Sequence, residues 1–359
     1  MKKLKIQTLI DLHGFQNTVD ELNLHVSEKG NLVLLKYKQI EADWSKEATH
    51  ECRGLILDAA NHYNVVSYPY EKFFNISEGY CADIDWDTAK VYEKADGSLA
   101  NLYYYNDKWN VQTSGTIDAD NRTNHVNYTF ADLFWLSVEK MYGDKDTFLA
   151  KLNKNYNYMF ELCTPYNIVV VPHNDFKIKL HGVRDMRSYE YVDIDTIDLV
   201  KVKTYDINSL DQINELIGTM DWTEEGFVVC DANFNRAKIK NPSYVAVHHT
   251  ATKTSPYAIM NVIKENEIDE FLAYFKHHEE EVMMLKEKWD DTLVYIQNFY
   301  DSINHIEDKK EFALEAQKFD KKYVGIIFSL RNKHIETVHE GMCRIHNRDW
   351  YNKFNENEK

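Results

Sequence analysis

Two short segments of the chain place lysines, in one of them beside an aspartate, in an arrangement that suits phosphate chemistry. Lys94-Ala95-Asp96-Gly97 follows the apolar pair Val91-Tyr92, so a lysine and a carboxylate stand on a turn between two expected strands. Lys238-Ile239-Lys240 alternates, which places both ammonium groups on one face of a strand and the isoleucine on the other. Cations placed in this way neutralise phosphate oxygens, and neighbouring acids can hold Mg²⁺ or a ribose hydroxyl.

Further charged residues stand at the ends of apolar runs or within them. Arg53 opens one run, Glu161 lies inside another, where an unpaired charge would be costly, and Glu225 precedes a third. Each residue alone also has an ordinary interpretation. Lys238 and Lys240 could be surface residues whose stems lie along apolar surface, and Glu161 could belong to an ion pair. The set as a whole, rather than any one segment, indicates a triphosphate–metal site.

The hydrophobic pattern places these residues in the first of two domains. β-Branched or aromatic runs bounded by Asn, Asp or Gly predict strands at 31–37, 54–58, 64–68, 99–105, 109–113, 158–162, 168–171, 227–230 and 237–240. Phe130, Phe134 and Val138 recur at helical spacing and predict one inserted helix. After about residue 250 the spacing is helical throughout. We expect an α+β fold class, with antiparallel sheets and flanking helices in residues 1–248 and an all-helical domain in residues 249–359.

Composition narrows the class of protein. The 42 Lys and Arg residues against 58 Asp and Glu residues give a net charge of −16, which opposes non-specific binding to a polyanion without excluding a nucleic-acid enzyme. Five cysteines, an odd number with no C-x-x-C pair, indicate neither a disulfide framework nor a zinc knuckle. No run of 18 apolar residues occurs, so we expect no membrane association. A cytoplasmic location is indicated, and no protein partner is implied.

In order and spacing, the charged segments resemble the motifs of the covalent nucleotidyltransferase superfamily, and most closely those of the bacteriophage T4-type RNA ligase 1 family. The Lys94 turn is similar to the family's first motif, and Phe160-Glu161 to its third. Glu225-Gly226-Phe227-Val228 is similar to the fourth motif, and Lys238-Ile239-Lys240 to the fifth. Segments near Arg53 and in 325–330 are also family-like, so the resemblance covers almost the whole chain.

The resemblance implies an ATP-dependent RNA ligase whose residues 1–248 form an adenylyltransferase (nucleotidyltransferase) domain. Lys94 would take AMP from ATP, pass it to a 5′-phosphate on RNA, and so allow that end to be joined to a 3′-hydroxyl. The implied ATP-binding residues are Tyr37, Arg53, Lys72, Glu161, Lys238 and Lys240. Asp96 and Glu225 would act near metal or ribose, and Tyr244 in the ligation step. The implied cofactors are ATP and Mg²⁺, with Mn²⁺ as a substitute.

The resemblance also implies a substrate. The family is associated with repair of tRNA broken in the anticodon loop, and its helical domain with the choice of tRNA, so nicked tRNA is the implied partner and the host-cell cytoplasm the location if a phage encodes the chain. From 309 to 348 there are nine Lys or Arg residues against five Asp or Glu residues. The candidate RNA contacts are Lys321, Lys322, Arg331 and Lys333. A solvated helix face is an equal alternative.

The chain departs from the family at one position, and two other classes of protein compete with it. Ser114 stands where the family carries a functional lysine. DNA ligases and GTP-dependent capping enzymes normally carry a β-barrel domain after the fifth motif, whereas the residues after Lys240 turn helical. A non-enzymatic RNA-binding protein would need neither the lysine–carboxylate cage nor covalent AMP. Phe176 or His181 could stack on adenine, although core or surface roles suit both equally well.

Overall fold

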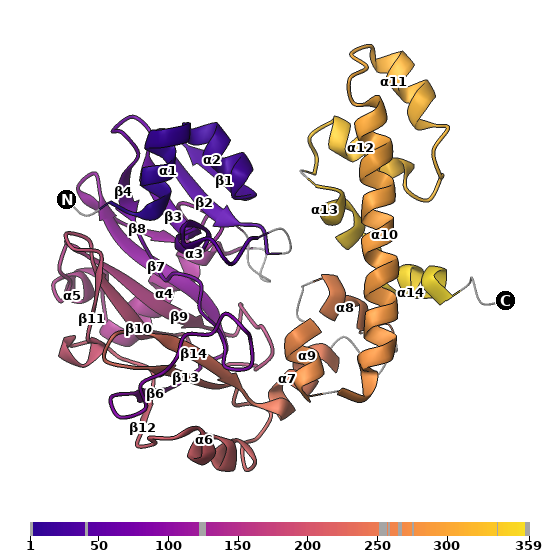
Figure 1. The fold of residues 1–359 in the computed structure, drawn as a ribbon. Coiled ribbons are helices and arrows are strands. Elements are labelled where there is room, and N and C mark those ends of the chain that lie inside the picture. The colour runs from indigo at the N-terminus through magenta and orange to yellow at the C-terminus, as the bar shows by residue number, and fades with distance from the viewer. Residues whose placement is uncertain are drawn as a thin grey trace. The chain divides into compact units, whose positions relative to one another are not determined.

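The computed structural model describes residues 3–39, 42–121, 127–250, 257, 259–264, 268–274, 276–335 and 337–355. The chain divides into two compact units, Met1–Val247 and His248–Lys359 (Figure 1). No helix in these ranges is both long and apolar enough to cross a membrane.

Three sheets form the framework of the first unit. The first sheet has the order β1-β2-β3-β4, the second β11-β10-β9-β7-β8, and the third β12-β6-β13-β14-β5. Their strands are β1 (Leu24–Lys29), β2 (Leu32–Tyr37), β3 (Arg53–Asp58), β4 (Asn64–Ser67), β5 (Phe74–Asn75), β6 (Lys90–Glu93), β7 (Ser98–Tyr105), β8 (Lys108–Gln112), β9 (Tyr156–Cys163), β10 (Lys177–Asp185), β11 (Glu190–Val192), β12 (Thr204–Tyr205), β13 (Gly226–Cys230) and β14 (Arg236–Lys240). All neighbouring strands pair antiparallel except β14 and β5, which run parallel.

Helices cover the sheets of the first unit and complete their cores. They are α1 (Lys5–His13), α2 (Phe15–Glu21), α3 (Glu47–Glu51), α4 (Phe130–Tyr142), α5 (Lys145–Leu149) and α6 (Leu210–Ile217), with a 3₁₀ turn at Ile194–Thr196. The boundary between the units falls within α7 (Pro242–Thr250). Ile6 of α1 joins the apolar core of the first sheet, and Phe134 of α4 joins that of the second. Ile213 of α6 packs in a third core with Phe227 and Ile239. Each sheet is thus held rigidly by its own buried apolar layer.

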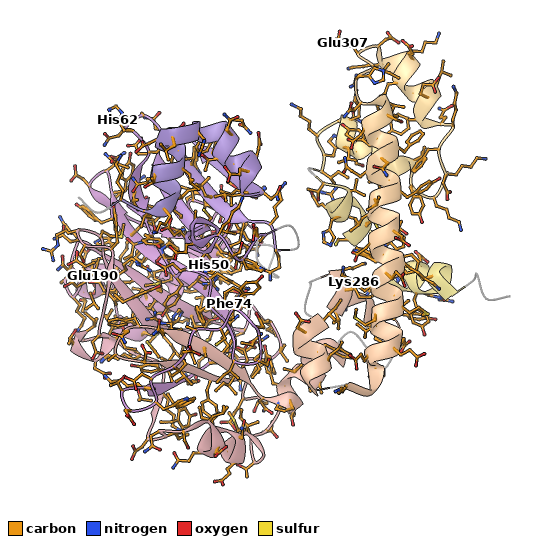
Figure 2. All side chains as sticks on the ribbon, in the orientation of Figure 1. His50, His62, Phe74, Glu190, Lys286 and Glu307 are labelled. Carbon is orange, nitrogen blue, oxygen red and sulfur yellow. The ribbon has the colours of Figure 1, made fainter. Side chains whose placement is uncertain are left out.

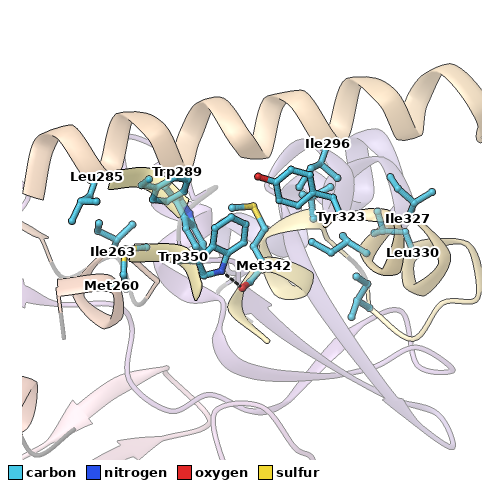
Figure 3. Close-up of a cluster of buried hydrophobic side chains, with 14 of the residues drawn as sticks. Met260, Ile263, Leu285, Trp289, Ile296, Tyr323, Ile327, Leu330, Met342 and Trp350 are labelled. Atoms are coloured by element: carbon cyan, nitrogen blue, oxygen red, sulfur yellow. Dashed lines mark hydrogen bonds between the residues drawn. The ribbon is translucent and has the colours of Figure 1, made fainter. Parts of the chain in front are cut away.

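The described part of the second unit is helical. Its elements are α8 (Ile259–Lys264), α9 (Ile268–Tyr274), a 3₁₀ turn Lys276–His278, α10 (Glu279–Ile303), α11 (Lys309–Ala316), α12 (Val324–Arg331), α13 (Val338–Cys343) and α14 (Asn347–Asn355). Trp289 on the long helix α10 packs against Trp350 on α14, with ring centroids 5.2 Å apart (Figure 3). The indole Nε1 of Trp350 donates a hydrogen bond of 2.9 Å to the carbonyl of Met342, which joins α14 to α13.

The structure confirms the mixed class with antiparallel sheets, helices and a helical C-terminal region, but one predicted strand is wrong. The run 168–171 is not a strand, although it is rich in β-branched residues. Its backbone amides at Val170 and Val171 donate to the carboxylate of Asp96, at 3.1 and 2.6 Å, instead of to a neighbouring strand. The partner of β9 on that side is β10, which begins only at Lys177.

Candidate active site

A cavity of about 330 Å³ lies in the first unit, with walls from all three sheets. Seven of the predicted site residues line it: Tyr37, Arg53, Lys72, Lys94, Glu161, Lys238 and Lys240. The first sheet contributes Arg53 at the start of β3, the second contributes Glu161 on β9, and the third contributes Lys238 on β14. Residues separated by more than a hundred positions in sequence therefore meet around one volume that can hold a small ligand.

The Lys94 turn forms part of the cavity wall, and hydrogen bonds and close packing fix its position. It connects β6 to β7, and the amide of Lys94 donates a 2.9 Å hydrogen bond to the carbonyl of Gly226. A β-carbon on Gly97 would lie 2.6 Å from the carbonyl oxygen of Leu162, so only glycine allows the turn to lie this close to β9. The Lys94 ammonium forms an ion pair with Glu225, whose side chain is only 7% exposed.

Asp96 and Tyr244 hold the same turn in place through hydrogen bonds. Asp96 is buried, and one carboxylate oxygen accepts a 2.6 Å hydrogen bond from the Tyr244 hydroxyl while the other accepts the amides of Val170 and Val171. Burial raises the pKa of Tyr244, with Glu225 and Asp96 adding to the effect, so its hydroxyl keeps the proton that it donates. Neither Asp96 nor Tyr244 lines the cavity, and neither does Glu225.

One strand supplies a row of three cations. Arg236, Lys238 and Lys240 alternate along β14 and all line the cavity, while Ile239 between the lysines is buried in the apolar core. Burial lowers the pKa of Lys238 to about 7, and Lys72 is the largest contributor among its charged neighbours. The prediction from sequence included Lys238 and Lys240 but not Arg236. Extending the same alternation two residues back would have found Arg236.

Two more cations line the cavity, Arg53 at the start of β3 and Lys72 in the segment between β4 and β5. Atom Nη1 of Arg53 is buried and has no hydrogen-bond partner within the described ranges. The Lys72 ammonium lies over three aromatic rings, 5.7 Å from the ring centroid of Tyr37, 5.0 Å from that of Trp44 and 5.1 Å from that of Phe74. A buried, unsatisfied guanidinium donor is costly unless a ligand completes it, which favours an anionic ligand here.

Ser114, where a family lysine is missing, lies next to this part of the first sheet. A β-carbon on Gly54 would approach the Cα of Ser114 to 3.0 Å, and one on Gly115 would lie 3.8 Å from the Lys36 ammonium nitrogen. Lys36 pairs across β2 and β3 with Arg53, and burial followed by the Arg53 charge lowers the pKa of its ammonium. An ammonium therefore reaches the Ser114 turn from another strand. Sequence reasoning missed Lys36 because only the strand register reveals it.

Glu161 is the acidic member of the lining that faces the lysines. Its Oε2 lies 3.4 Å from Nε2 of His181, whose ring stacks on Tyr70 with centroids 5.4 Å apart. His181 and Tyr70 both line the cavity, whereas Phe176, the other candidate for stacking on adenine, does not. The two further acids of the lining, Glu93 and Asp193, form ion pairs with lysines that do not line it.

The candidate RNA contacts belong to the second unit and fall into two groups. Lys321, Lys322 and Lys333 are exposed. Arg331 instead donates hydrogen bonds to the carbonyls of Asn304, Ile306 and Glu307, at 3.2, 2.6 and 3.0 Å, just after α10 ends. Its guanidinium also lies 4.7 Å from the ring centroid of Phe312. Arg331 therefore secures the end of α10, as basic residues at helix C-termini often do.

The lining as a whole carries an excess of positive charge. Six Lys or Arg side chains line the cavity against three acids, and two of those acids are already paired elsewhere. A polyphosphate would compensate this excess, because charge-assisted hydrogen bonds from Lys and Arg to phosphate oxygens are strong. The lysine that is held by a buried carboxylate at the edge of the same cavity is placed to react with such a ligand.

Comparison with known proteins agrees with this chemistry. The model of a family described as RNA ligase matches residues 51–244, which include Arg53, the Lys94 turn and β14. An RNA ligase of Rhodothermus phage RM378 is 26% identical, over 82% of this chain and 84% of that protein. A putative bifunctional polynucleotide kinase/RNA ligase of Autographa californica nuclear polyhedrosis virus is 28% identical over 76% of this chain, and the match spans 42% of that longer protein.

The solved structure of an archaeal ATP-dependent RNA ligase matches at 11% identity and a TM-score of 0.47, over 83% of each chain. The family match covers more than half of the 359 residues and contains the lysine turn, so the resemblance read from the motifs is confirmed. The chain belongs to the RNA ligase family.

Proposed function

We propose that this RNA ligase uses ATP and works through a covalent lysyl-AMP at Lys94. The observation that carries the proposal is the pairing of Lys94 with the buried carboxylate of Glu225 at the edge of a cavity whose other walls are cationic. Lys238, Lys240, Arg53 and Lys72 would bind the triphosphate. Glu161 would accept a hydrogen bond from a ribose hydroxyl.

In the first step, the Lys94 ammonium gives a proton to Glu225, to which it is already hydrogen bonded, and this exposes the lone pair of Nζ. The lone pair attacks the α-phosphorus of ATP, a P–N bond forms, and the bond between the α-phosphorus and its bridging oxygen breaks. Pyrophosphate leaves with that electron pair and takes the second proton that Nζ loses. Burial raises the pKa of Glu225, so this carboxylate is a better proton acceptor than an exposed one. The cations on β14 offset the charge that gathers on the departing phosphates.

The donor set suits Mg²⁺ that arrives with the nucleotide. Within the described ranges, no three His, Cys, Asp or Glu side chains gather into a metal cage. Mg²⁺ commonly uses only one or two carboxylates together with phosphate oxygens and water. Glu161, at the cavity wall, is the carboxylate that would hold it with one oxygen while the other accepts the ribose hydroxyl, and Mn²⁺ prefers the same ligands. The ion would supply further charge compensation at the phosphates.

In the later steps, AMP passes to the 5′-phosphate of an RNA, and a 3′-hydroxyl then displaces it to form the phosphodiester. We propose nicked tRNA as the natural substrate. Residues 1–248 would be the adenylyltransferase domain and 249–359 the domain that selects tRNA, which the exposed cations Lys321, Lys322 and Lys333 support. Tyr244 would serve ligation by holding the lysine turn through Asp96.

The experiment is intact-mass analysis after incubation with ATP and Mg²⁺ and without RNA. The parent should gain one AMP, and Lys94→Ala should gain none. Lys108→Ala, which removes an exposed lysine on β8, should label as the parent does. An adduct that survives Lys94→Ala would reject the assignment. Labelling with GTP as efficient as with ATP would favour a capping enzyme instead.

A further inference from the structure

A second groove adjoins the cavity in the first unit. Its volume is about 240 Å³, and it shares Lys72, Phe73, Phe234 and Arg236 with the cavity. The residues that line only this groove are His50, Glu71, Phe74, Tyr80, Ala82, Tyr191 and Asn235. None of the functional assignments above uses these seven residues.

The groove combines aromatic faces with positive charge. Tyr191 and Phe234 stack with ring centroids 5.5 Å apart, and the Arg236 guanidinium lies 4.0 Å from the ring centroid of Tyr191. The ring centroids of Phe74 and Tyr80, which also line the groove, lie 5.7 Å apart, and Tyr80 is 54% exposed. His50 and Phe74, which Figure 2 labels close together, have ring centroids 5.5 Å apart. Aromatic faces beside cations bind single-stranded nucleic acid through base stacking and backbone contacts.

The charge of the groove is positive within this acidic chain. Glu71 is its one lining acid, and that carboxylate accepts a hydrogen bond from Tyr68 and lies 3.6 Å from the buried guanidinium of Arg184. Lys72 and Arg236 consequently outweigh it. A ligand that fits must present a flat apolar surface and a negative charge together, which is the chemistry of a nucleotide.

The position of Phe234 is itself unusual. Its φ of 63° is a left-handed conformation that is rare for an aromatic residue. The loop between β13 and β14 enforces it, because the Asp231 carboxylate accepts the amides of Asn233 and Asn235, each at 2.9 Å, and the Asp231 carbonyl accepts the amide of Phe234. Strained residues held by their surroundings in this way are concentrated at binding sites. Here the strain presents an aromatic ring to both the groove and the cavity.

The second step of the reaction requires that the RNA 5′-phosphate approach the lysyl-AMP from the side of the phosphate-binding cations. Lys94 attacks the α-phosphorus opposite the departing pyrophosphate, so the group that later displaces Lys94 in line must enter where pyrophosphate left. Lys72, which would bind the phosphates of ATP, lines both the cavity and the groove. After pyrophosphate departs, a second phosphate that comes from the groove can reach the same ammonium.

We propose that the groove binds the 5′-phosphorylated terminal nucleotide of the RNA. Its base stacks beside Tyr80, and its phosphate reaches Lys72 and the lysyl-AMP. A 5′-phosphate oxygen then attacks the α-phosphorus, the P–N bond breaks, and its electron pair returns to Nζ of Lys94, which takes up a proton. This assignment rests on the proposed function and deepens it by naming the site of the RNA end.

Tyr80 lines the groove and not the cavity, so it separates the two sites. Tyr80→Ala should form lysyl-AMP at the parent rate. Purified lysyl-AMP enzyme, free of pyrophosphate, is then mixed with a 5′-phosphorylated single-stranded oligoribonucleotide, and loss of AMP from the protein is followed in single turnover. Base–aromatic stacking makes a difference of about fivefold to more than a hundredfold in affinity. Tyr80→Ala should therefore need at least about fivefold more RNA for half-maximal transfer, whereas Tyr80→Phe should match the parent.

Trp222→Ala is the matched control, because Trp222 is a partly exposed aromatic residue that lines neither site. Equal half-saturation for Tyr80→Ala and Trp222→Ala would overturn the proposal. A defect confined to sealing of pre-adenylated RNA onto a 3′-hydroxyl strand would also overturn it, since the groove would then hold the other strand. If the parent forms no lysyl-AMP, the proposed function fails. Fluorescence anisotropy of the oligonucleotide with parent and Tyr80→Ala would still decide whether the groove binds RNA.

Discussion

The charge state of Lys238 should make nucleotide binding depend on pH. Burial, followed by four neighbouring cations, lowers the pKa of this lysine to about 7, far below its ordinary value of 10.5. A triphosphate stabilises the charged form, so binding above pH 7 must return a proton to Lys238. We expect affinity for the nucleotide to fall as pH rises above 7 and to level off below it.

The size of the effect follows from the fraction of Lys238 that is charged before binding. That fraction falls from about a quarter at pH 7.5 to about one per cent at pH 9, which corresponds to about a 25-fold loss of affinity. The second ionisation of a phosphate is near pH 6, so the ligand itself changes little over this window. The test uses α,β-methylene-ATP, whose bridging carbon prevents reaction, in isothermal titration calorimetry with two buffers of different ionisation enthalpy. Proton uptake should be visible directly.

Two variants isolate the titrating group. The arginine in Lys238→Arg stays charged over the whole pH range, so this variant should bind the nucleotide tightly at every pH. Lys238→Gln should bind it weakly at every pH. Because the folded pKa lies below that of the unfolded chain, the unfolded chain binds the extra proton, and the free protein should lose stability as pH falls from about 10 towards 7. Lys238→Gln should reduce that loss. A parent without a slope, or a Lys238→Arg variant with the parent's slope, would refute the reasoning.

Two further predictions concern the residues around the reacting lysine. Lys36→Met should slow lysyl-AMP formation measured by intact mass. Adding Ser114→Lys to that variant should restore the rate, because a lysine at position 114 would bring an ammonium to the turn that Lys36 normally reaches. If the rate does not recover, Lys36 does not replace the missing lysine. Tyr244→Phe leaves an oxygen of buried Asp96 without its donor, so the free energy of unfolding in urea should fall by about 1–3 kcal/mol and lysyl-AMP formation should slow. Unchanged adenylation would show that Tyr244 does not hold the Lys94 turn.

The part of the site carried by single strands could be predicted from the sequence. Alternation alone placed Lys238 and Lys240 on one face with Ile239 in the core, because side chains in a strand point to opposite faces. The strand predicted at 168–171 was wrong because its backbone bonds to a distant side chain rather than to a neighbouring strand. Ile168 and Val169 are exposed, and the two backbone amides that follow them donate hydrogen bonds to the carboxylate of Asp96, a residue more than seventy positions earlier. A hydrophobic pattern cannot show that a side chain will take the place of a strand partner.

Contacts between segments far apart in the chain could not be predicted either, because a local pattern does not show which distant segment will pack beside it. The pair of Lys94 with Glu225 spans 131 positions, and the approach of Lys36 to Gly115 depends on the register of β2 against β3. A charge count likewise could not distinguish Arg331 from the lysines near it. Its guanidinium is engaged by carbonyls that become available only where α10 ends.

The exposed lysines of the second unit and the hydrogen-bonded Arg331 should differ in their effect on tRNA binding. If Lys321, Lys322 and Lys333 contact a tRNA backbone, changing all three to Gln should reduce the preference for nicked tRNA over a plain single strand. Lysyl-AMP formation should not change, since every proposed ATP contact lies in the first unit. The slope of log affinity against log salt should become shallower by about two to three, because each lost phosphate contact removes a little less than one.

Arg331→Ala should behave differently from the three-lysine variant. Loss of its hydrogen bonds to the carbonyls after α10 should lower the melting temperature and leave the salt slope of tRNA binding nearly unchanged. Changing Lys108, Lys145 and Lys154 of the first unit to Gln matches the charge removed and controls for the net charge of the chain. If the three-lysine variant seals nicked tRNA and the plain strand as the parent does, those lysines only face solvent. A salt slope lowered equally by the control would show that overall charge, rather than a tRNA contact on the helical unit, sets the affinity.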